Sequence, residues 1–103
     1  MGIPFKDEEI LPALAGIIRE ALRVPAEKIV PGARIFGDLG AESIDILDIR
    51  FRIEETFGFK IPEGDIIRSI DPGQSLEQLK ERFTVGSVAD YVRGRLSAEA
   101  QSP

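Results

Sequence analysis

The chain has 103 residues, of which 43% are apolar and 30% are charged, and its formal net charge is −5. This length suits one small domain covering residues 1–103, and no apolar run approaches the roughly 18 residues that a bilayer-spanning helix needs. The absence of cysteine and histidine excludes disulfides, thiolate or imidazole metal sites and the usual general bases of enzymes. The acidic balance argues against nucleic acid as a partner, because nucleic-acid binding selects clustered Lys and Arg.

The first residues, MGIPFKDEE, contain no targeting signal that we can identify. They lack the basic start and apolar core of a secretory signal. Lys6 stands where a myristoylation motif requires Ser or Thr. We therefore expect a cytoplasmic protein without stable insertion into a membrane.

Residues 7–24, DEEILPALAGIIREALRV, predict the first helix, because their apolar residues recur every three or four positions. Pro12 is compatible with this helix only in its first turn. Residues 25–40 contain two prolines and three glycines, which predict a long ordered loop. Four apolar residues of this loop are expected to fill the core: Ile29, Ile35, Phe36 and Leu39.

Residues 42–56 predict the second helix, and its apolar side chains form two stripes instead of one. At about 100° per residue, one stripe has helical spacing and is the expected core face. The other lies on nearly the opposite side with acidic residues around it, which is typical of a partner surface, unless a loop covers it. The core stripe is Ile46, Ile49, Ile53 and Phe57, and the second stripe is Ile44, Leu47 and Phe51.

The negative charge is concentrated on the same stretch. Residues 38–55 contain six acids and two arginines, a net charge of −4, whereas the other 85 residues have twelve acids and eleven bases, a net charge of −1. A basic partner surface is therefore expected. The acids lack the ligand spacing and the glycine of an EF-hand loop, so we expect no metal site.

Ser43 stands at or just inside the start of the second helix. Backbone N–H groups and the helix dipole favour an attached or bound anion at that position. The structural alternative is a helix N-cap, which is the commonest role of a serine there.

Residues 38–62, DLGAESIDILDIRFRIEETFGFKIP, resemble the helix-two region of acyl carrier proteins. The usual form of that region is Asp-Leu-Gly-Ala-Asp-Ser-Leu-Asp, followed two turns later by a Glu-Glu pair and then by Phe and Ile-Pro. The resemblance implies that Ser43 is esterified with 4′-phosphopantetheine, whose thiol carries acyl groups as thioesters. It also implies a partner face, which we define as Asp38, Glu42, Ile44, Asp45, Leu47, Asp48, Phe51, Glu54 and Glu55.

The partners that the resemblance implies are a phosphopantetheinyl transferase and the acyl-loading, elongating and acyl-transfer enzymes, each with a basic docking surface. Complementary charge speeds encounter and sets orientation more than it adds affinity, which suits a carrier that must also dissociate. We expect a monomer. Glu42 and Ile44 replace the usual Asp and Leu but keep charge or bulk. Arg50 and Arg52 dilute the acidic helix and indicate a specialised carrier.

The segment 68–83 is an insertion relative to the usual acyl carrier pattern. SLEQ reads as a capping box with Ser75 as N-cap, and Leu76, Leu79 and Phe83 repeat at helical spacing. An extra short helix is expected, with a surface loop as the alternative. The last helix begins after Thr84 as N-cap, with an apolar face that consists of Val85, Val88, Ala89, Val92 and Leu96. Residues 97–103 should fray.

The sequence thus predicts an all-α fold: a small four-helix bundle of the acyl-carrier type, with a long loop between the first two helices and an extra short helix before the last. It predicts a carrier for fatty-acid or specialised-lipid biosynthesis and not an enzyme, because no base accompanies Ser43. Two alternatives remain open. One is an aminoacyl or polyketide carrier, and the other is a helical protein-interaction module in which Ser43 is unmodified.

Overall fold

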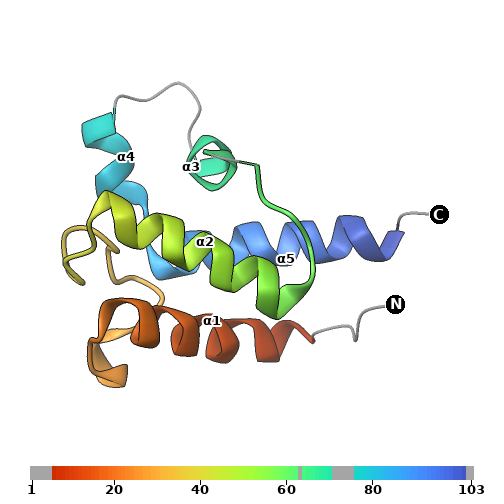
Figure 1. Ribbon diagram of the computed structural model, residues 1–103, viewed down its shortest axis with the longest axis horizontal. Helices are drawn as coiled ribbons and strands as arrows, with labels where there is room; N and C mark the ends of the chain where they lie inside the picture. Colours follow the sequence, from red (N-terminus) through yellow and green to blue (C-terminus); the bar gives the residue numbers. More distant parts are fainter. Residues whose placement is uncertain (1–5, 63, 71–75, 102–103) are drawn as a thin grey trace.

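The computed structural model describes residues 6–62, 64–70 and 76–101. Within these ranges the chain is helical, and its one extended pairing is an isolated bridge between Arg34 and Thr84, so the prediction of an all-α fold is confirmed. Figure 1 shows the helices in chain order, which are α1 (Asp7–Leu22), η1 (Ala26–Lys28), α2 (Ser43–Phe57), α3 (Asp65–Ile70), α4 (Leu76–Arg82) and α5 (Val85–Gln101).

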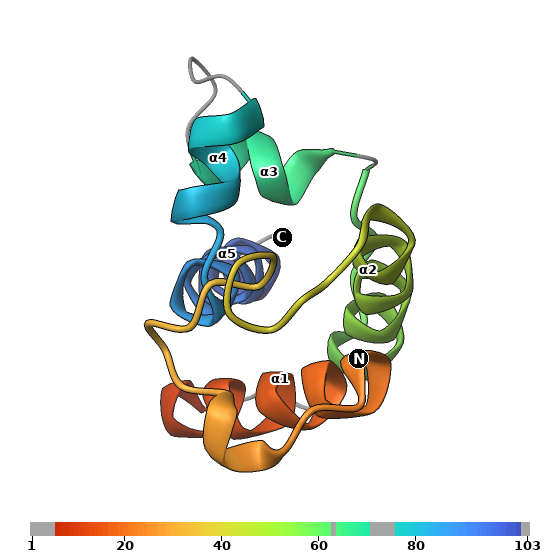
Figure 2. The ribbon, with the colours of Figure 1, turned by 90° about the vertical axis from the view of Figure 1, so that its left-hand side faces the viewer.

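Three longer helices surround the core. α1 packs against both α2 and α5, while α3 packs against α5 and α4. Figure 2 shows α1, α2 and α5 arranged around the centre, with α3 and α4 above α5 on the side away from α1. The fully buried residues come from α1, α2, α5 and the loop before α2 and are all aliphatic: Ile10, Leu14, Ile18, Ile35, Ile53, Val85, Val88 and Val92.

α1 begins earlier than its proline suggests. Pro12 is the sixth residue of α1, so the expectation that it falls in the first turn is wrong. A proline inside a helix leaves the carbonyl four residues earlier, here that of Glu8, without its partner. Glu8 and Pro12 are both exposed, so water can hydrate that carbonyl and the helix tolerates the ring.

The long loop between α1 and α2 is ordered because it is hydrogen-bonded to the start of α5. The Ile35 N–H donates to the Phe83 carbonyl at 2.9 Å, and the Val85 N–H donates to the Ala33 carbonyl at 3.0 Å. The Gly86 N–H donates to the Pro31 carbonyl at 2.8 Å. The predicted core residues of this loop are buried, with Phe36 half-buried and packed against Phe83: Ile29, Ile35, Phe36 and Leu39.

The insertion forms the predicted extra helix, α4, which lies at the edge of the bundle (Figure 1). Phe83 is buried in the core at its end. The proposed N-cap, Ser75, lies outside the described residues, as do the side chains of Leu76 and Leu79.

Thr84 caps α5 as predicted. The Ser87 N–H donates to the Thr84 hydroxyl at 3.1 Å, and the Thr84 N–H donates to the Ser87 hydroxyl at 2.9 Å. The predicted apolar face of α5 is buried, with Leu96 half-buried at its end. α5 continues to Gln101, so it includes part of the tail for which fraying remains a prediction.

Candidate functional site

Ser43 is the first residue of α2 and its side chain is exposed. α2 therefore begins at this serine, and Figure 2 shows the long loop joining the start of α2 at one end of the bundle. Glu42 is the N-cap and has an extended backbone. Serine is therefore not the N-cap itself, and among the described residues its hydroxyl receives no recorded hydrogen bond. An exposed hydroxyl without an internal partner is available for modification.

The residues before Ser43 present it from a fixed platform. Leu39 and Ala41 are buried at 6% and 8% exposure. Gly40 lies between them with φ +72°, a left-handed conformation that residues with a Cβ rarely adopt. The buried side chains of Leu39 and Ala41 and the left-handed Gly40 thus fix the path of the loop up to two residues before Ser43.

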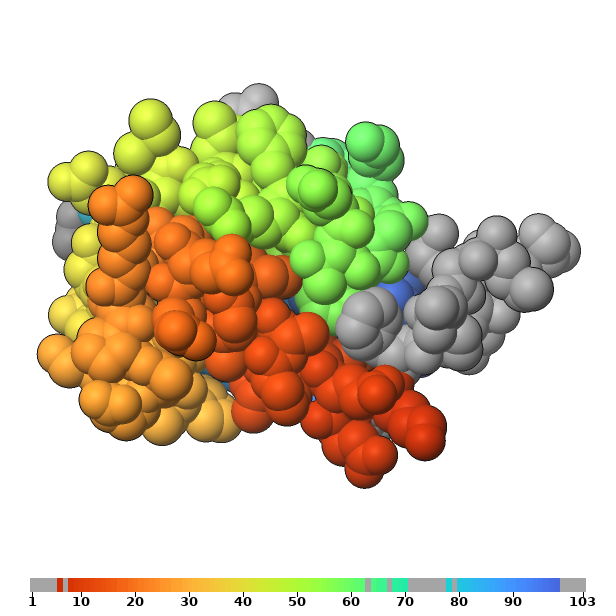
Figure 3. All heavy atoms as spheres, turned by 60° about the horizontal axis from the view of Figure 1, so that its bottom comes forward, coloured from red at the N-terminus to blue at the C-terminus, as the bar shows by residue number. Residues whose placement is uncertain are grey.

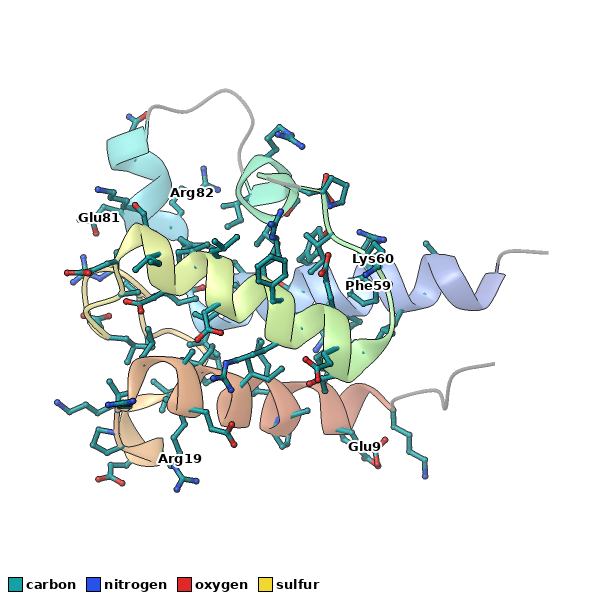
Figure 4. The ribbon with its side chains drawn as sticks, viewed as in Figure 1. Glu9, Arg19, Phe59, Lys60, Glu81 and Arg82 are labelled. Atoms are coloured by element: carbon teal, nitrogen blue, oxygen red, sulfur yellow. The ribbon has the colours of Figure 1, made fainter. Side chains whose placement is uncertain are left out.

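Asp38 stabilises the same loop through hydrogen bonds of its side chain. Its carboxylate accepts hydrogen bonds from the Arg34 backbone N–H at 2.8 Å and from the Arg34 guanidinium at 3.2 and 3.3 Å. These hydrogen bonds, chiefly the side-chain one, lower the pKa of Asp38. Arg34 also pairs with Glu81 of α4, which Figure 4 labels at the end of that helix. Asp38 is therefore part of an internal network as well as of the predicted partner face.

The two apolar stripes of α2 lie as the sequence predicts. Ile49 and Ile53 are 2% and 0% exposed, and Phe57 is also buried, whereas Ile46 is half-buried. On the other side, Ile44, Leu47 and Phe51 are 71%, 44% and 51% exposed. Figure 3 shows α1 and α2 side by side on one face, with the loop before α2 at one end. No described segment covers the second stripe, so it is available to a partner.

Several acids of the partner face also have partners inside the chain. The Asp45 carboxylate accepts the Glu42 N–H at 2.8 Å and completes the start of α2. Asp48 pairs with Arg52 at 3.0 Å, and Arg52 pairs with Glu20 of α1 at 3.1 Å. The spacings of three and four residues along a helix would have indicated the first two contacts from sequence.

Glu54 and Arg50 contact the segment that follows α2. The Glu54 carboxylate accepts the Ile61 N–H at 2.7 Å, and an Arg50 guanidinium N–H donates to the Ile61 carbonyl at 3.4 Å. Figure 4 labels Phe59 and Lys60 on this segment, beside α5. Glu55, by contrast, is exposed and has no side-chain contact recorded among the described residues. No sequence signal for the Ile61 contacts exists, because they depend on how the chain returns after α2.

The start of α2 is suited to an anionic group. Ser43 is followed by 14 further residues of helix in a 15-residue α2, so the free N–H groups and the dipole at its N-terminus favour a negatively charged group there. The described residues provide no cluster of three or more acids, His or Cys that could hold a metal ion. Nor do they include a helix long and apolar enough to cross a membrane.

Comparison with known proteins agrees with this geometry. Residues 12–83 match a family model described as a phosphopantetheine attachment site. An acyl carrier protein of Thermosynechococcus vestitus is 33% identical over 94 residues, which are 91% of this chain and 100% of the relative. Acyl carrier proteins of Thermotoga maritima and Lactobacillus johnsonii are each 32% identical, over 86% and 72% of this chain and 94% and 92% of their own lengths. The chain therefore belongs to the phosphopantetheine-attachment family of acyl carriers, which are not enzymes and hold their cargo on covalent 4′-phosphopantetheine.

Proposed function

We propose that Ser43 is the residue to which 4′-phosphopantetheine is attached. The observation that carries the proposal is its position, as the exposed first residue of α2, three residues after the left-handed Gly40, which lies between the buried Leu39 and Ala41. The hydroxyls of two other serines are engaged. Ser69 donates to the Ile66 carbonyl within α3 and Ser87 donates to the carbonyl of Thr84, the N-cap of α5, each at 2.7 Å.

The chain itself does not supply a base for this attachment. It has no histidine, and the titratable groups nearest to Ser43 in the sequence are the carboxylates of Glu42 and Asp45. The Asp45 carboxylate already accepts a hydrogen bond from the Glu42 N–H at the start of the helix. The proton of the serine hydroxyl is therefore removed by a group of the phosphopantetheinyl transferase. A base that belongs to the transferase and not to this chain agrees with a carrier that is a substrate of other enzymes.

We further propose that the cargo is an acyl group of fatty-acid or specialised-lipid biosynthesis. The exposed stripe of Ile44, Leu47 and Phe51 would bind the loading, elongating and transfer enzymes, and the acids around it would meet basic residues of those enzymes. Internal ion pairs of Asp38 and Asp48 weaken the acidic field, because each carboxylate faces an arginine of this chain. Glu42 and Glu55 then remain as the exposed acids of this face for which no ion pair is recorded among the described residues.

Modification tests the attachment site. The protein is incubated with a phosphopantetheinyl transferase and coenzyme A, and its intact mass is measured. We expect the mass of one phosphopantetheine group to be added to the wild type and none to Ser43→Ala, because no other serine of the sequence follows an Asp-Leu-Gly-Ala-acid string. Ser97→Ala, which changes an exposed serine of α5, is the matched control and should be modified fully. Modification of Ser43→Ala would disprove the assignment.

Loading then tests the cargo. The modified protein is offered to a fatty acyl, an aminoacyl and a polyketide-type loading enzyme under the same conditions, and each thioester is detected by mass. Exclusive loading by either of the last two would replace the lipid assignment, and absence of modification would favour an interaction module.

We also propose that the carrier is a cytoplasmic monomer. Light scattering after size-exclusion chromatography tests the oligomeric state.

A further inference from the structure

Arg50 is an arginine of α2 in an environment unlike that of Arg52. Arg52 forms ion pairs with Asp48 and Glu20 at 3.0 and 3.1 Å. Arg50 is half-buried, and no carboxylate among the described residues is recorded within ion-pair distance of it. Instead its guanidinium lies over the ring of Phe51, 5.0 Å from the ring centroid. A cation that is partly removed from water normally has an anionic or carbonyl partner.

The hydrogen bonds of Arg50 are incomplete. One terminal N–H reaches the Ile61 carbonyl at 3.4 Å, which is longer than the usual N–H···O distance of about 3 Å. Its Nε atom is buried and has no hydrogen-bond partner in the part of the chain that the structure describes. Buried donors are nearly always paired in folded proteins, so an orphaned one indicates a missing acceptor.

The position of Arg50 relates it to Ser43. Seven residues are nearly two helical turns, so the two side chains lie within about 20° of the same stripe of α2. The rise between them is about 10 Å. Helical side chains lean towards the N-terminus, so the long Arg50 side chain can reach towards Ser43 as well as towards the Ile61 carbonyl, where it lies in the structure. Glu54, the next residue of the stripe, is already occupied by the Ile61 N–H.

We therefore propose that Arg50 donates hydrogen bonds to an amide carbonyl of the phosphopantetheine arm and holds the arm along α2, beside Ile61. This inference rests on the attachment of the arm to Ser43. The arm contains amide carbonyls along its length, whereas the cargo is attached at its far end. A donor about two turns from the attachment point therefore suits the arm better than the cargo. Arg50 is a positioning residue for the arm and has no role in chemistry.

A spin label on the arm tests this proposal. Because the chain contains no cysteine, a thiol-reactive nitroxide attaches to the arm alone. Electron paramagnetic resonance then separates immobilised from freely moving arms. In Arg50→Met, which keeps the length but removes the donors, we expect the ratio of immobilised to mobile arms to fall roughly tenfold, as for loss of a charged hydrogen bond. Arg50→Lys, which keeps one donor group, should retain part of the immobilised population.

Arg52→Met is the matched control. It removes an arginine of the same helix, but one that faces α1 through Glu20, so we expect the arm to behave as in the wild type. Melting temperatures of all variants show whether α2 remains folded. Equal mobility in the wild type and Arg50→Met would overturn the proposal. A change in the Arg50 Nε–H resonance that appears only after an acyl group is loaded on the unlabelled arm would also overturn it, because the acceptor would then belong to the cargo.

A measurement on the wild type alone removes any dependence on folding of the variants. The Arg50 Nε–H resonance is compared by nuclear magnetic resonance before and after modification. We expect a downfield shift and slower exchange with water in the modified form, and no such change for Arg52. An unchanged Arg50 resonance in protein that has gained the full mass of the arm overturns this inference alone. Failure to gain that mass overturns the attachment site and this inference together.

Discussion

Tyr91 is the only tyrosine of the chain, and its hydroxyl group connects α5 to α3. It donates a short hydrogen bond to the Asp65 carboxylate and accepts one from Arg95 at 2.8 Å. Arg95 also donates to the Lys60 carbonyl at 2.8 Å and lies 4.6 Å from the centroid of the Phe59 ring. One phenol and one guanidinium thus fix α3 and the segment after α2 against the last helix.

This environment predicts an unusual titration. Burial, followed by the hydrogen bond to Asp65, raises the pKa of Tyr91 to about 12, against about 10 in an unfolded chain. The neutral phenol is the form that the fold stabilises, so this contribution to stability is present below pH 10 and is lost between pH 10 and 12. Ultraviolet absorbance of tyrosinate, with no second tyrosine to interfere, gives the midpoint directly.

Two substitutions control that measurement. Asp65→Asn removes the negative charge beside the phenol and should lower the midpoint towards its ordinary value. Asp90→Asn, on the helix of Tyr91 but paired with Arg93, should leave it unchanged. A native midpoint near 10 in the wild type would contradict the described contact between Asp65 and Tyr91.

At the scale of the element, α2 serves the core with one face and partners with the other. Ile49→Asp and Ile53→Asp should unfold the protein, because an unpaired buried carboxylate costs several kcal/mol in a domain with about 5 to 15 kcal/mol of total stability. Leu47→Asp and Phe51→Asp should keep the fold but weaken loading by partner enzymes. Circular dichroism melts and loading rates of the four variants measure both effects. Equal losses of melting temperature in the two pairs would show that the second stripe contributes to the core.

α5 contains two glycines with opposite expected effects on stability. A Cβ on Gly86 would lie 3.0 Å from the Pro31 carbonyl oxygen, whereas a Cβ on Gly94 would meet nothing within 4 Å. Gly86→Ala should therefore displace the loop and cost about 1 to 3 kcal/mol, as overpacking does. Gly94→Ala should stabilise the helix by about 0.5 to 1 kcal/mol, because alanine has the higher helix propensity.

Chemical denaturation measures the free energy of unfolding for this pair. If Gly86→Ala proved as stable as Gly94→Ala, the hydrogen bond between residues 86 and 31 would not constrain the loop before α2. Because the two positions belong to the same helix, a general change in the stability of α5 cannot account for a difference in sign.

For the whole molecule, the sequence predicts those features that depend on local spacing. Periodicity and capping patterns, which operate over a few residues, account for the two stripes of α2, the start of that helix near Ser43, the cap at Thr84 and the extra helix α4. The resemblance to acyl carriers adds the cofactor. Pro12 is the exception, because the tolerance of α1 for a proline depends on which side of the helix faces water.

The features that the sequence does not predict join distant segments. Arg34 pairs with Glu81 across 47 positions, and Arg95 reaches the Lys60 carbonyl across 35. The contacts of Arg50 and Glu54 with Ile61 depend on the path of the chain after α2. Such contacts require a known arrangement of the helices, since a side chain can reach many backbone groups of similar chemistry.

The hydrogen bonds between residues 31–35 and residues 83–86 have a consequence for biosynthesis. The loop that ends in Ser43 is fixed by Phe83, Val85 and Gly86, which are made forty or more residues after it. A chain still growing on the ribosome has α2 available long before these partners leave the exit tunnel, so its serine is not yet held in the final geometry. With the proposed attachment at Ser43, we therefore expect the arm to be added only after residues 83–86 have been made, and chains that lack them to be poor substrates for the transferase.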